Sequence, residues 1–292
     1  MISLVVSTIG RADELERLLS ALSSQTFQDF EVVIVDQNPD ERLNGVISRN
    51  EHLEIQHIRS EKGLSLGRNV GLQAVRGEII AIPDDDCWYP RDLLANVNTW
   101  FEEHAQFSIL FTAVLDENGL QQGPKRRSVV ACECDRDTVW HCGISFNAFL
   151  RRSVVESVGQ FDERIGAGCP TIFKSGEETD YFLRAMDKGK RAWYEPSLSV
   201  FHPSLRDHAR VLMQAYPYAL GTGFVLRKHR CSCRKLFADF LVWSFGGGLV
   251  SLCRCNFHVA RVRFMRGWGQ LLGYILAGRL LQGDADKTGV HS

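Results

Sequence analysis

The chain has 292 residues, enough for one large domain or for one domain with a substantial additional segment. Its 45% apolar and 24% charged residues are ordinary for a folded soluble protein and exclude a largely disordered chain. The net charge of −1 conceals an asymmetry, because residues 227–279 contain ten Lys or Arg and one acid, a local charge of +9. The C-terminal part therefore presents a different kind of surface from the rest of the chain.

Apolar runs separated by helical patterns organise the first hundred residues. Residues 2–6 predict a buried strand, and Leu15, Leu18, Leu19 and Leu22 then recur on one side of a predicted helix. Strands that are apolar throughout, with helices between them, indicate a mostly parallel α/β sheet covered on both faces, as in Rossmann-like folds. The further runs that predict strands are residues 31–35, 53–58 and 78–82.

Polar residues follow three of these strands. Thr8 and Arg11 come after the first strand, Asp36 ends the second, and Asp84–Asp86 follow the fourth. Ligands of such sheets bind at the carboxyl ends of the strands. The three pieces are therefore expected to converge on one crevice.

The acidic triplet Asp84–Asp86 is the most informative of these pieces. Neighbouring carboxylates repel one another by about 1 kcal/mol per pair even in water, so a cationic partner is expected there. Mg²⁺ or Mn²⁺ would suit hard oxygen ligands next to a phosphate-bearing substrate. The alternative is a solvated acidic turn that precedes the helix starting near Pro90.

A glycine-rich stretch, residues 63–71, begins a predicted helix between the third and fourth strands. The free N–H groups of a helix start favour an anion, and Arg68 adds a guanidinium suited to phosphate. The alternative is a helix start that needs flexible glycines.

The alternation continues with a helix at 90–103 and a strand at 109–115, and residues 116–142 look irregular. Glu177, Glu178 and Asp180 open a later helix, where acids are common as dipole partners. Two short strands are predicted at 191–194 and 197–201, the second followed by His202.

The nine cysteines and the absence of a signal-like start predict an unexported protein with reduced thiols. The C-x-C and C-x₇-C spacings do not match common zinc sites. Structural or surface thiols are the favoured interpretation.

The ordered motifs of residues 1–205 resemble those of inverting family 2 glycosyltransferases with the GT-A fold. This resemblance implies a GT-A catalytic domain at 1–205, followed by a basic, apolar helical segment at 206–292. The matching blocks are Val5–Thr8 with Gly10–Arg11, Gln25–Asp36, Gly67–Gly71, Asp84–Asp86, Gly176–Asp180 and Val200–Pro203.

The resemblance implies transfer of a sugar from a UDP, GDP or TDP sugar to an acceptor hydroxyl, with inversion at the anomeric carbon. Donor-binding roles, from base to ribose, diphosphate and sugar, would fall to Thr8, Arg11, Asp36, Arg68, Asp84 and Asp85. Mn²⁺ or Mg²⁺ would be held by Asp86, with Asp84 and His202 as further candidate ligands. Residues 37–39 depart from the pattern of many relatives, which leaves the nucleotide and sugar open.

The catalytic base implied by the resemblance is the acid that follows the first Glu of the 177–180 motif. That position is Glu178, where relatives often carry Asp, so Asp180 stays open as a second candidate. An incoming hydroxyl must lose its proton to a group within hydrogen-bond reach, and a bound cation can neutralise the departing diphosphate.

The basic segment has two apolar stretches, residues 236–252 and 268–281. Each is shorter than the roughly 20 residues that span a bilayer, and Gly246–Gly248 weaken a helix, so no spanning helix is predicted. Aromatic faces flanked by cations favour helices lying on an anionic membrane surface. The expected protein is cytoplasmic and peripheral on the inner face of the membrane, with a glycan or lipid-linked acceptor from cell-surface polysaccharide assembly.

Other interpretations of the same features remain. The C-terminal helices could pack on the catalytic domain with solvated cations, and no nucleic-acid recognition module is seen. A sugar-1-phosphate nucleotidyltransferase is an alternative function, although residues 7–11 lack the longer glycine-rich loop with Lys that such enzymes carry. A non-catalytic glycan-binding or scaffold protein is the third.

Overall fold

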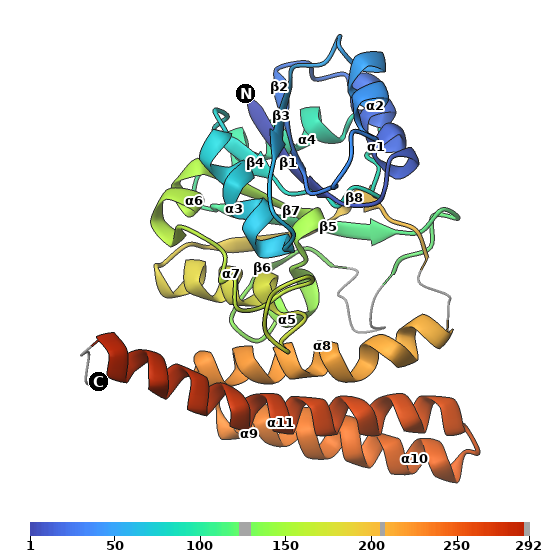
Figure 1. The fold of residues 1–292 in the computed structure, drawn as a ribbon, viewed down its shortest axis with the longest axis vertical. Helices are drawn as coiled ribbons and strands as arrows, with labels where there is room; N and C mark the ends of the chain where they lie inside the picture. The colour runs from blue at the N-terminus through green and yellow to red at the C-terminus, as the bar shows by residue number, and fades with distance from the viewer. Residues whose placement is uncertain (123–129, 205–207, 289–292) are drawn as a thin grey trace. The chain divides into compact units, whose positions relative to one another are not determined.

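The computed structural model describes residues 1–122, 130–204 and 208–288, and it comprises two compact units (Figure 1). The sheet unit consists of residues 1–161 and 181–204, and the helical unit of residues 162–180 with those from 205 onward. The boundary expected at residue 205 stays a prediction. The second unit additionally contains the loop and helix start at 162–180.

One eight-stranded sheet forms the centre of the sheet unit, in the order β3-β2-β1-β4-β7-β5-β8-β6. The four strands at the β3 end are parallel, β7 is antiparallel to both neighbours, and β5 is parallel to β8. This confirms the expected mostly parallel α/β fold. The strands are β1 Ile2–Thr8, β2 Phe30–Asp36, β3 Ile55–Arg59, β4 Ile79–Ala81, β5 Ile109–Leu115, β6 Cys132–Cys134, β7 Ala148–Arg151 and β8 Ala192–Phe201.

Helices cover this sheet and complete its core. The four leucines of α1 are all buried, as their spacing predicts, and they pack with β1, β2 and α4 in one hydrophobic cluster. The helices are α1 Asp13–Ser23, α2 Asn44–Arg49, α3 Leu64–Ala74, α4 Leu93–Glu103, α5 Val139–Cys142, α6 Arg152–Val158 and α7 Glu177–Asp187, whose first turn belongs to the helical unit.

Two local predictions differ from the structure. Residues 116–142 were expected to be irregular, yet they contain β6 and α5. The two short strands predicted at 191–194 and 197–201 are one strand, β8, whose pairing with β5 shifts between Thr112 and Ala113. Pro196 lies opposite that shift, where a residue without an N–H removes a ladder hydrogen bond.

The helical unit is built around two long helices, α8 His208–Lys228 and α11 Phe257–Thr288. Their backbones touch at glycines: a Cβ on Gly223 would lie 2.2 Å from Gln270 O, and one on Gly273 would lie 2.2 Å from Leu220 O. Any larger residue at these positions would push the helices apart. The remaining elements are α9 Cys233–Leu236, the π-helix η2 Phe237–Gly246 and α10 Gly247–Cys253.

Gly246–Gly248 were expected to weaken a helix, yet the chain stays helical through all three residues. A Cβ on Gly247 would lie 2.2 Å from Arg263 Nη1, and one on Gly248 would lie 2.7 Å from the Phe264 ring, so close packing against α11 explains both. Among the described residues, Arg234–Cys253 is one helical segment long and apolar enough to cross a membrane by length and composition. No such segment was predicted from the sequence, because the apolar run at 236–252 alone is shorter than a bilayer requires.

A buried carboxylate, Glu31 on β2, ties together the amino-terminal ends of the parallel strands. It accepts hydrogen bonds from Ser3 Oγ at 2.6 Å, from the Arg76 backbone N–H at 2.6 Å and from Gln56 Nε2 at 2.7 Å. Burial alone would raise the pKa of Glu31, but these hydrogen bonds outweigh it and hold the pKa below the ordinary value of 4.5. Glu31 should therefore stabilise the fold most strongly at neutral pH.

Replacing Glu31 by glutamine is expected to lower the free energy of unfolding at pH 7 by about 2 kcal/mol, the scale of hydrogen bonds to a charged group. Because its pKa is depressed, this advantage of the native protein is present above pH 4.5 and shrinks as the pH falls through the folded-state pKa. Urea unfolding of both proteins at pH 7 and at a pH below the folded-state pKa measures this difference in stability. The same change at exposed Glu54, which also pairs with Arg76, should have little effect; equal losses would contradict the assignment.

Candidate active site

Side chains from separate strands meet at the carboxyl ends of β1 and β4, as the sheet topology predicts. The two strands pair in parallel, so Arg11 after β1 lies next to the acidic triplet after β4. Trp88 and Phe201 exchange backbone hydrogen bonds of 3.1 and 3.0 Å, which brings His202 to the same place. The sheet unit therefore assembles one charged cluster from three distant pieces of sequence.

Two arginines are the cationic partners of the acidic triplet Asp84–Asp86. Arg11 Nη1 lies 2.7 Å from Asp85 Oδ1 and 2.7 Å from Asp86 Oδ2. Arg68 Nη2 lies 3.4 Å from Asp84 Oδ1. Burial raises the pKa of Asp85, and the charge of Arg11 offsets only part of that rise. The solvated acidic turn is thus the weaker interpretation, because Asp85 is buried and Asp86 is mostly so.

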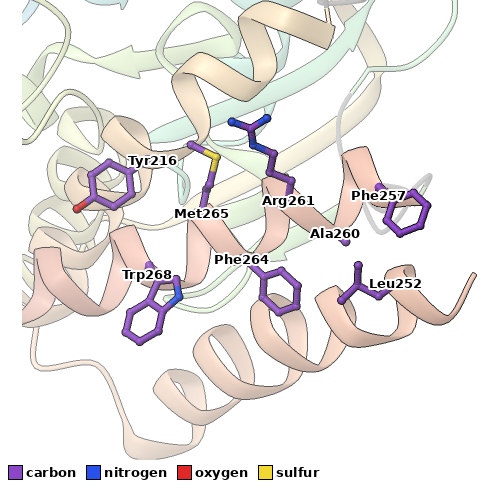
Figure 2. Close-up of a pocket in the computed structure, with 8 residues that line it drawn as sticks. All are labelled: Tyr216, Leu252, Phe257, Ala260, Arg261, Phe264, Met265 and Trp268. Carbon is purple, nitrogen blue, oxygen red and sulfur yellow. The ribbon is translucent and has the colours of Figure 1, made fainter. Parts of the chain in front are cut away.

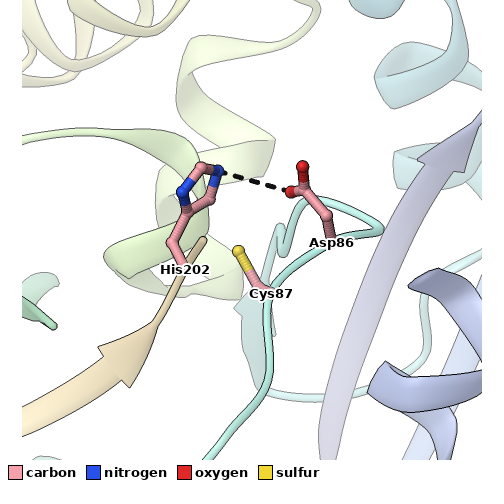
Figure 3. A group of neighbouring side chains, drawn as sticks. All are labelled: Asp86, Cys87 and His202. Atoms are coloured by element: carbon pink, nitrogen blue, oxygen red, sulfur yellow. Dashed lines mark ion pairs between the residues drawn. The ribbon is translucent and has the colours of Figure 1, made fainter. Parts of the chain in front are cut away.

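Asp86, Cys87 and His202 form the group best suited to a metal ion among the described residues (Figure 3). Asp86 Oδ1 is buried, accepts no hydrogen bond from the described part of the chain, and lies 3.4 Å from His202 Nε2. His202 Nδ1 lies 2.8 Å from Pro203 O and can donate to it, which leaves Nε2 facing Asp86. A carboxylate oxygen and an imidazole nitrogen aimed at one point fit a divalent cation.

Cys87 and His202 differ in their suitability as metal ligands. Burial, together with the neighbouring carboxylates, raises the pKa of the Cys87 thiol well above its usual value. Mg²⁺ and Mn²⁺ prefer oxygen ligands to sulfur, so Cys87 is a poor ligand for them. Burial lowers the pKa of His202, but the contact with Asp86 outweighs it and raises the pKa overall. A cation at this point would compete with a proton on His202. Asp86 and His202 are the fitting ligands.

Asp36, the predicted contact of the nucleotide base, is buried at the end of β2. Its Oδ1 accepts hydrogen bonds from the Asn38 backbone at 2.9 Å and side chain at 2.8 Å. Its Oδ2 lies 3.0 Å from His57 Nε2 and 2.6 Å from Arg59 Nη1. Burial raises its pKa, yet these partners pull the pKa below the ordinary value. His57 and Arg59 were not predicted from the sequence, because only strand pairing places them beside Asp36.

The other predicted donor residues lie in the same unit. Thr8 is buried, and its Oγ1 donates to Arg11 O at 3.4 Å. Arg68 is 1% exposed, donates to Ser145 Oγ at 2.6 Å, and lies 5.5 Å from the Phe161 ring centroid. A guanidinium so enclosed is held rigidly.

Glycines at the start of α3 have a packing role. A Cβ on Gly67 would lie 2.8 Å from Ser7 Oγ, and one on Gly71 would lie 2.3 Å from Val5 Cγ1. Both glycines therefore let α3 sit directly on β1. This supports a structural explanation for these two glycines. Arg68 is then the residue of this stretch that is suited to binding a ligand.

Within the helical unit, the acids of the 177–180 motif have different environments. Asp180 is fully buried, and its Oδ1 lies 2.8 Å from both Lys228 Nζ and His229 Nε2 at the end of α8. Lys228 also lies 2.8 Å from Asp162 Oδ2, which Arg164 Nη2 contacts at 2.7 Å. These five residues form a compact ionic network. Glu178 is half-buried instead.

Lys228 and His229 were not predicted as partners of Asp180, because the cations from the end of α8 onward were assigned to a surface. No local pattern marks a Lys-His pair as the partner of an acid some fifty positions earlier. The available signal was that three acids begin this helix, although one acid is enough to interact with the helix dipole.

Comparisons with known proteins agree with this fold. Residues 3–159 match the sequence profile described as glycosyl transferase family 2. The chain is 24% identical over 260 residues to the glycosyltransferase AglE of Haloferax volcanii, covering 85% of this chain and 81% of AglE. It is 36% identical over 93 residues to an uncharacterized glycosyltransferase of Haemophilus influenzae, covering 31% of each protein.

Two solved structures are similar in fold. Residues 1–349 of S. aureus TarS in complex with UDP-GlcNAc give a TM-score of 0.59 at 17% identity, with 99% of this chain and 92% of that chain covered. The mannosyltransferase PcManGT of Pyrobaculum calidifontis in complex with GDP-Man and Mn²⁺ gives 0.60 at 16% identity, with 92% and 86% covered. Against the longer TarS chain, this protein spans 54% of its length. The likeness confirms the expected GT-A fold.

Proposed function

Because the chain belongs to glycosyl transferase family 2, we propose that it transfers a sugar from a nucleoside diphosphate sugar to an acceptor hydroxyl, with inversion at the anomeric carbon. The observation that carries this proposal is the cluster of Arg11, Asp84–Asp86 and His202 at the carboxyl ends of β1 and β4. That is the edge where parallel sheets bind ligands. The family assignment favours this activity over a nucleotidyltransferase or a scaffold.

The donor is proposed to bind over this edge. Solved relatives of the same fold bind UDP-GlcNAc or GDP-Man, which supports a nucleotide sugar of the UDP, GDP or TDP type. Thr8, Arg11 and Asp36 would border the nucleotide. Arg68 would contribute fixed positive charge for the diphosphate, and Asp84 or Asp85 would contact ribose or sugar.

A divalent cation, Mn²⁺ or Mg²⁺, is proposed at Asp86 with His202 as second ligand and Asp84 as a further candidate. When bound, such an ion would neutralise negative charge on the leaving diphosphate. The buried Asp86 Oδ1, which accepts no hydrogen bond from the described residues, supports this assignment. Arg11 would hold Asp85 and Asp86 in place through its guanidinium.

The base is proposed to be Glu178. A base must give up its existing partners to accept a proton, and Asp180 is fully buried with its Oδ1 2.8 Å from both Lys228 Nζ and His229 Nε2. Glu178 is the half-buried acid of the same turn, so it can exchange its contacts at lower cost. It would take the proton of the acceptor hydroxyl, and Asp180 would anchor the helix start that carries it.

The acceptor is proposed to be a glycan or lipid-linked glycan in cell-surface polysaccharide assembly, reached at the inner face of the cytoplasmic membrane. Support comes from the helical unit, where large apolar side chains and cations are both exposed. Anionic lipids attract such surfaces. The protein would then act as a peripheral enzyme, and Arg234–Cys253 would supply apolar surface for the contact.

A panel of nucleotide sugars tests the proposal directly. With Mn²⁺ present, one nucleotide class should raise the melting temperature, because a ligand at 100 times its Kd stabilises the folded state by about 2.7 kcal/mol. Chelation with EDTA should remove most of that shift. NMR of the product formed from the best donor would give the anomeric configuration. No stabilisation of the folded protein by any nucleotide sugar would contradict the proposal, and a retained configuration would overturn the inverting mechanism.

A further inference from the structure

The helical unit carries an apolar pocket open to solvent (Figure 2). Six of its lining residues form one stripe of α11 with spacings of three and four, and Figure 2 shows them along a single stretch of that helix. Tyr216 of α8 and Leu252 of α10 border the stripe. The stripe consists of Phe257, Ala260, Arg261, Phe264, Met265 and Trp268.

The dimensions of this stripe suit one hydrocarbon chain. From Phe257 to Trp268 a helix rises about 16 Å. One leaflet of a bilayer contributes about 15 Å of hydrocarbon, half of the core thickness. A single acyl chain laid along α11 would therefore cover the stripe from end to end.

The pocket is costly to leave in water. Phe257, Trp268 and Leu252 expose 67%, 59% and 39% of their surfaces. Trp268 also has a polar N–H edge, and tryptophan is typical of membrane interfaces. Other large apolar residues of the same unit are also exposed. Among them are Leu241, Trp243, Leu249 and Ile275.

The positive charge around the pocket indicates which kind of molecule covers its apolar surface. Residues 227–279 carry a net charge of +9, and a second copy of the chain would bring the same charge to the contact. Arg261 belongs to the pocket wall, and exposed Arg254 lies between Leu252 and Phe257 in the sequence. An apolar chain joined to an anionic head group matches both the stripe and these guanidinium groups.

We propose that this pocket binds one acyl chain of an anionic phospholipid, whose phosphate lies against Arg254 and Arg261. The inference rests on the proposed membrane association and names the lipid and the residues that hold it. Such a pocket would tie the enzyme to membrane regions rich in anionic lipid, in addition to general attraction by the basic surface.

Tryptophan fluorescence of the full chain tests this, because bromine atoms on an acyl chain quench only indoles that they touch. Vesicles of phosphatidylglycerol brominated along the acyl chain should quench the protein, and vesicles of brominated phosphatidylcholine should quench it far less. Trp268→Phe should remove a large part of the quenching. Trp193→Phe, in the sheet unit, is the matched control and should leave it unchanged.

A second pair of variants separates the pocket from general surface attraction. Ala260→Phe should fill the pocket and reduce the quenching of Trp268, while sedimentation with phosphatidylglycerol vesicles is retained because the cations are intact. Leu252→Phe, at the exposed border, should reduce accessibility in the same way without adding an indole, if Ala260→Phe fails to fold. Arg254→Gln with Arg261→Gln should remove the preference for the anionic lipid.

The outcomes distinguish the two proposals. Equal quenching of Trp268→Phe and the native protein, or unchanged quenching in both pocket-filling variants, would overturn the lipid site. A dimer seen by sedimentation velocity and dissociated by Leu252→Phe would also overturn it. If donor turnover persists in these cases, only the pocket assignment is lost. Absence of donor turnover in a folded protein that still binds the acyl chain would contradict the proposed transferase activity alone.

Discussion

Replacing Asp86 by asparagine is expected to lower sugar transfer and donor hydrolysis by about 10³-fold. The loss follows from the proposed cation site, because charge stabilisation by a metal ion is worth several kcal/mol and each 1.36 kcal/mol is a factor of ten in rate. The amide keeps the size of the side chain but loses the charge that Arg11 and His202 face. Initial rates with saturating Mn²⁺ measure the effect.

A second measurement makes this prediction independent of catalysis. Mn²⁺ should raise the melting temperature of the native protein in the presence of nucleotide, and Asp86→Asn should abolish the increase. His202→Ala should weaken it, whereas Cys87→Ser should leave it nearly unchanged, because Mn²⁺ prefers oxygen ligands to a thiol. Asp40→Asn is the matched control, since Asp40 is exposed and pairs with Arg42. A normal Mn²⁺ response in Asp86→Asn would remove Asp86 from the metal site.

Replacing Glu178 by glutamine is expected to reduce the transfer rate by about 10²–10⁴-fold, the usual contribution of a general base. Glutamine has the same length but cannot take a proton from the acceptor hydroxyl. Donor affinity should stay near normal, so kcat falls while the Kd for the nucleotide sugar does not. Transfer assays and donor titration separate the two quantities.

Asp180→Asn provides the contrast within the same turn. Removing this charge leaves Lys228 and His229 facing a neutral amide in a buried network, and breaking a buried ion pair typically costs about 3 kcal/mol of stability. The expected result is a lower unfolding free energy with a smaller loss of kcat than in Glu178→Gln. The opposite pattern, with a stable inactive Asp180→Asn and an active Glu178→Gln, would make Asp180 the base.

Several features of the candidate site could be predicted from the sequence because local patterns carry them. The apolar runs of β1 and β2 and the leucines of α1 are buried as their spacing indicates. The placement of Asp84–Asp86 at a strand end followed from the apolar run before it, and the parallel topology then required it to lie beside Arg11. These inferences need only the periodicity of strands and the rule that their carboxyl ends gather at one edge.

Other features depend on pairings between distant segments. β7 runs antiparallel between β4 and β5, although its sequence is as apolar as that of a parallel strand. Arg59 and His57 reach Asp36 only because β3 pairs with β2 in that register. A strand carries no local signal for its direction or register, so neither could be predicted.

By itself, the amino-acid sequence determined the α/β architecture, the acidic cluster after β4 and the charge asymmetry of the C-terminal segment, because composition and periodicity are local properties. Only the tertiary structure decided which charges neutralise one another: Arg11 with Asp85 and Asp86, and Lys228 with Asp162 and Asp180. The physical reason is that an ion pair depends on distance and burial, and both arise when segments far apart in the chain pack together.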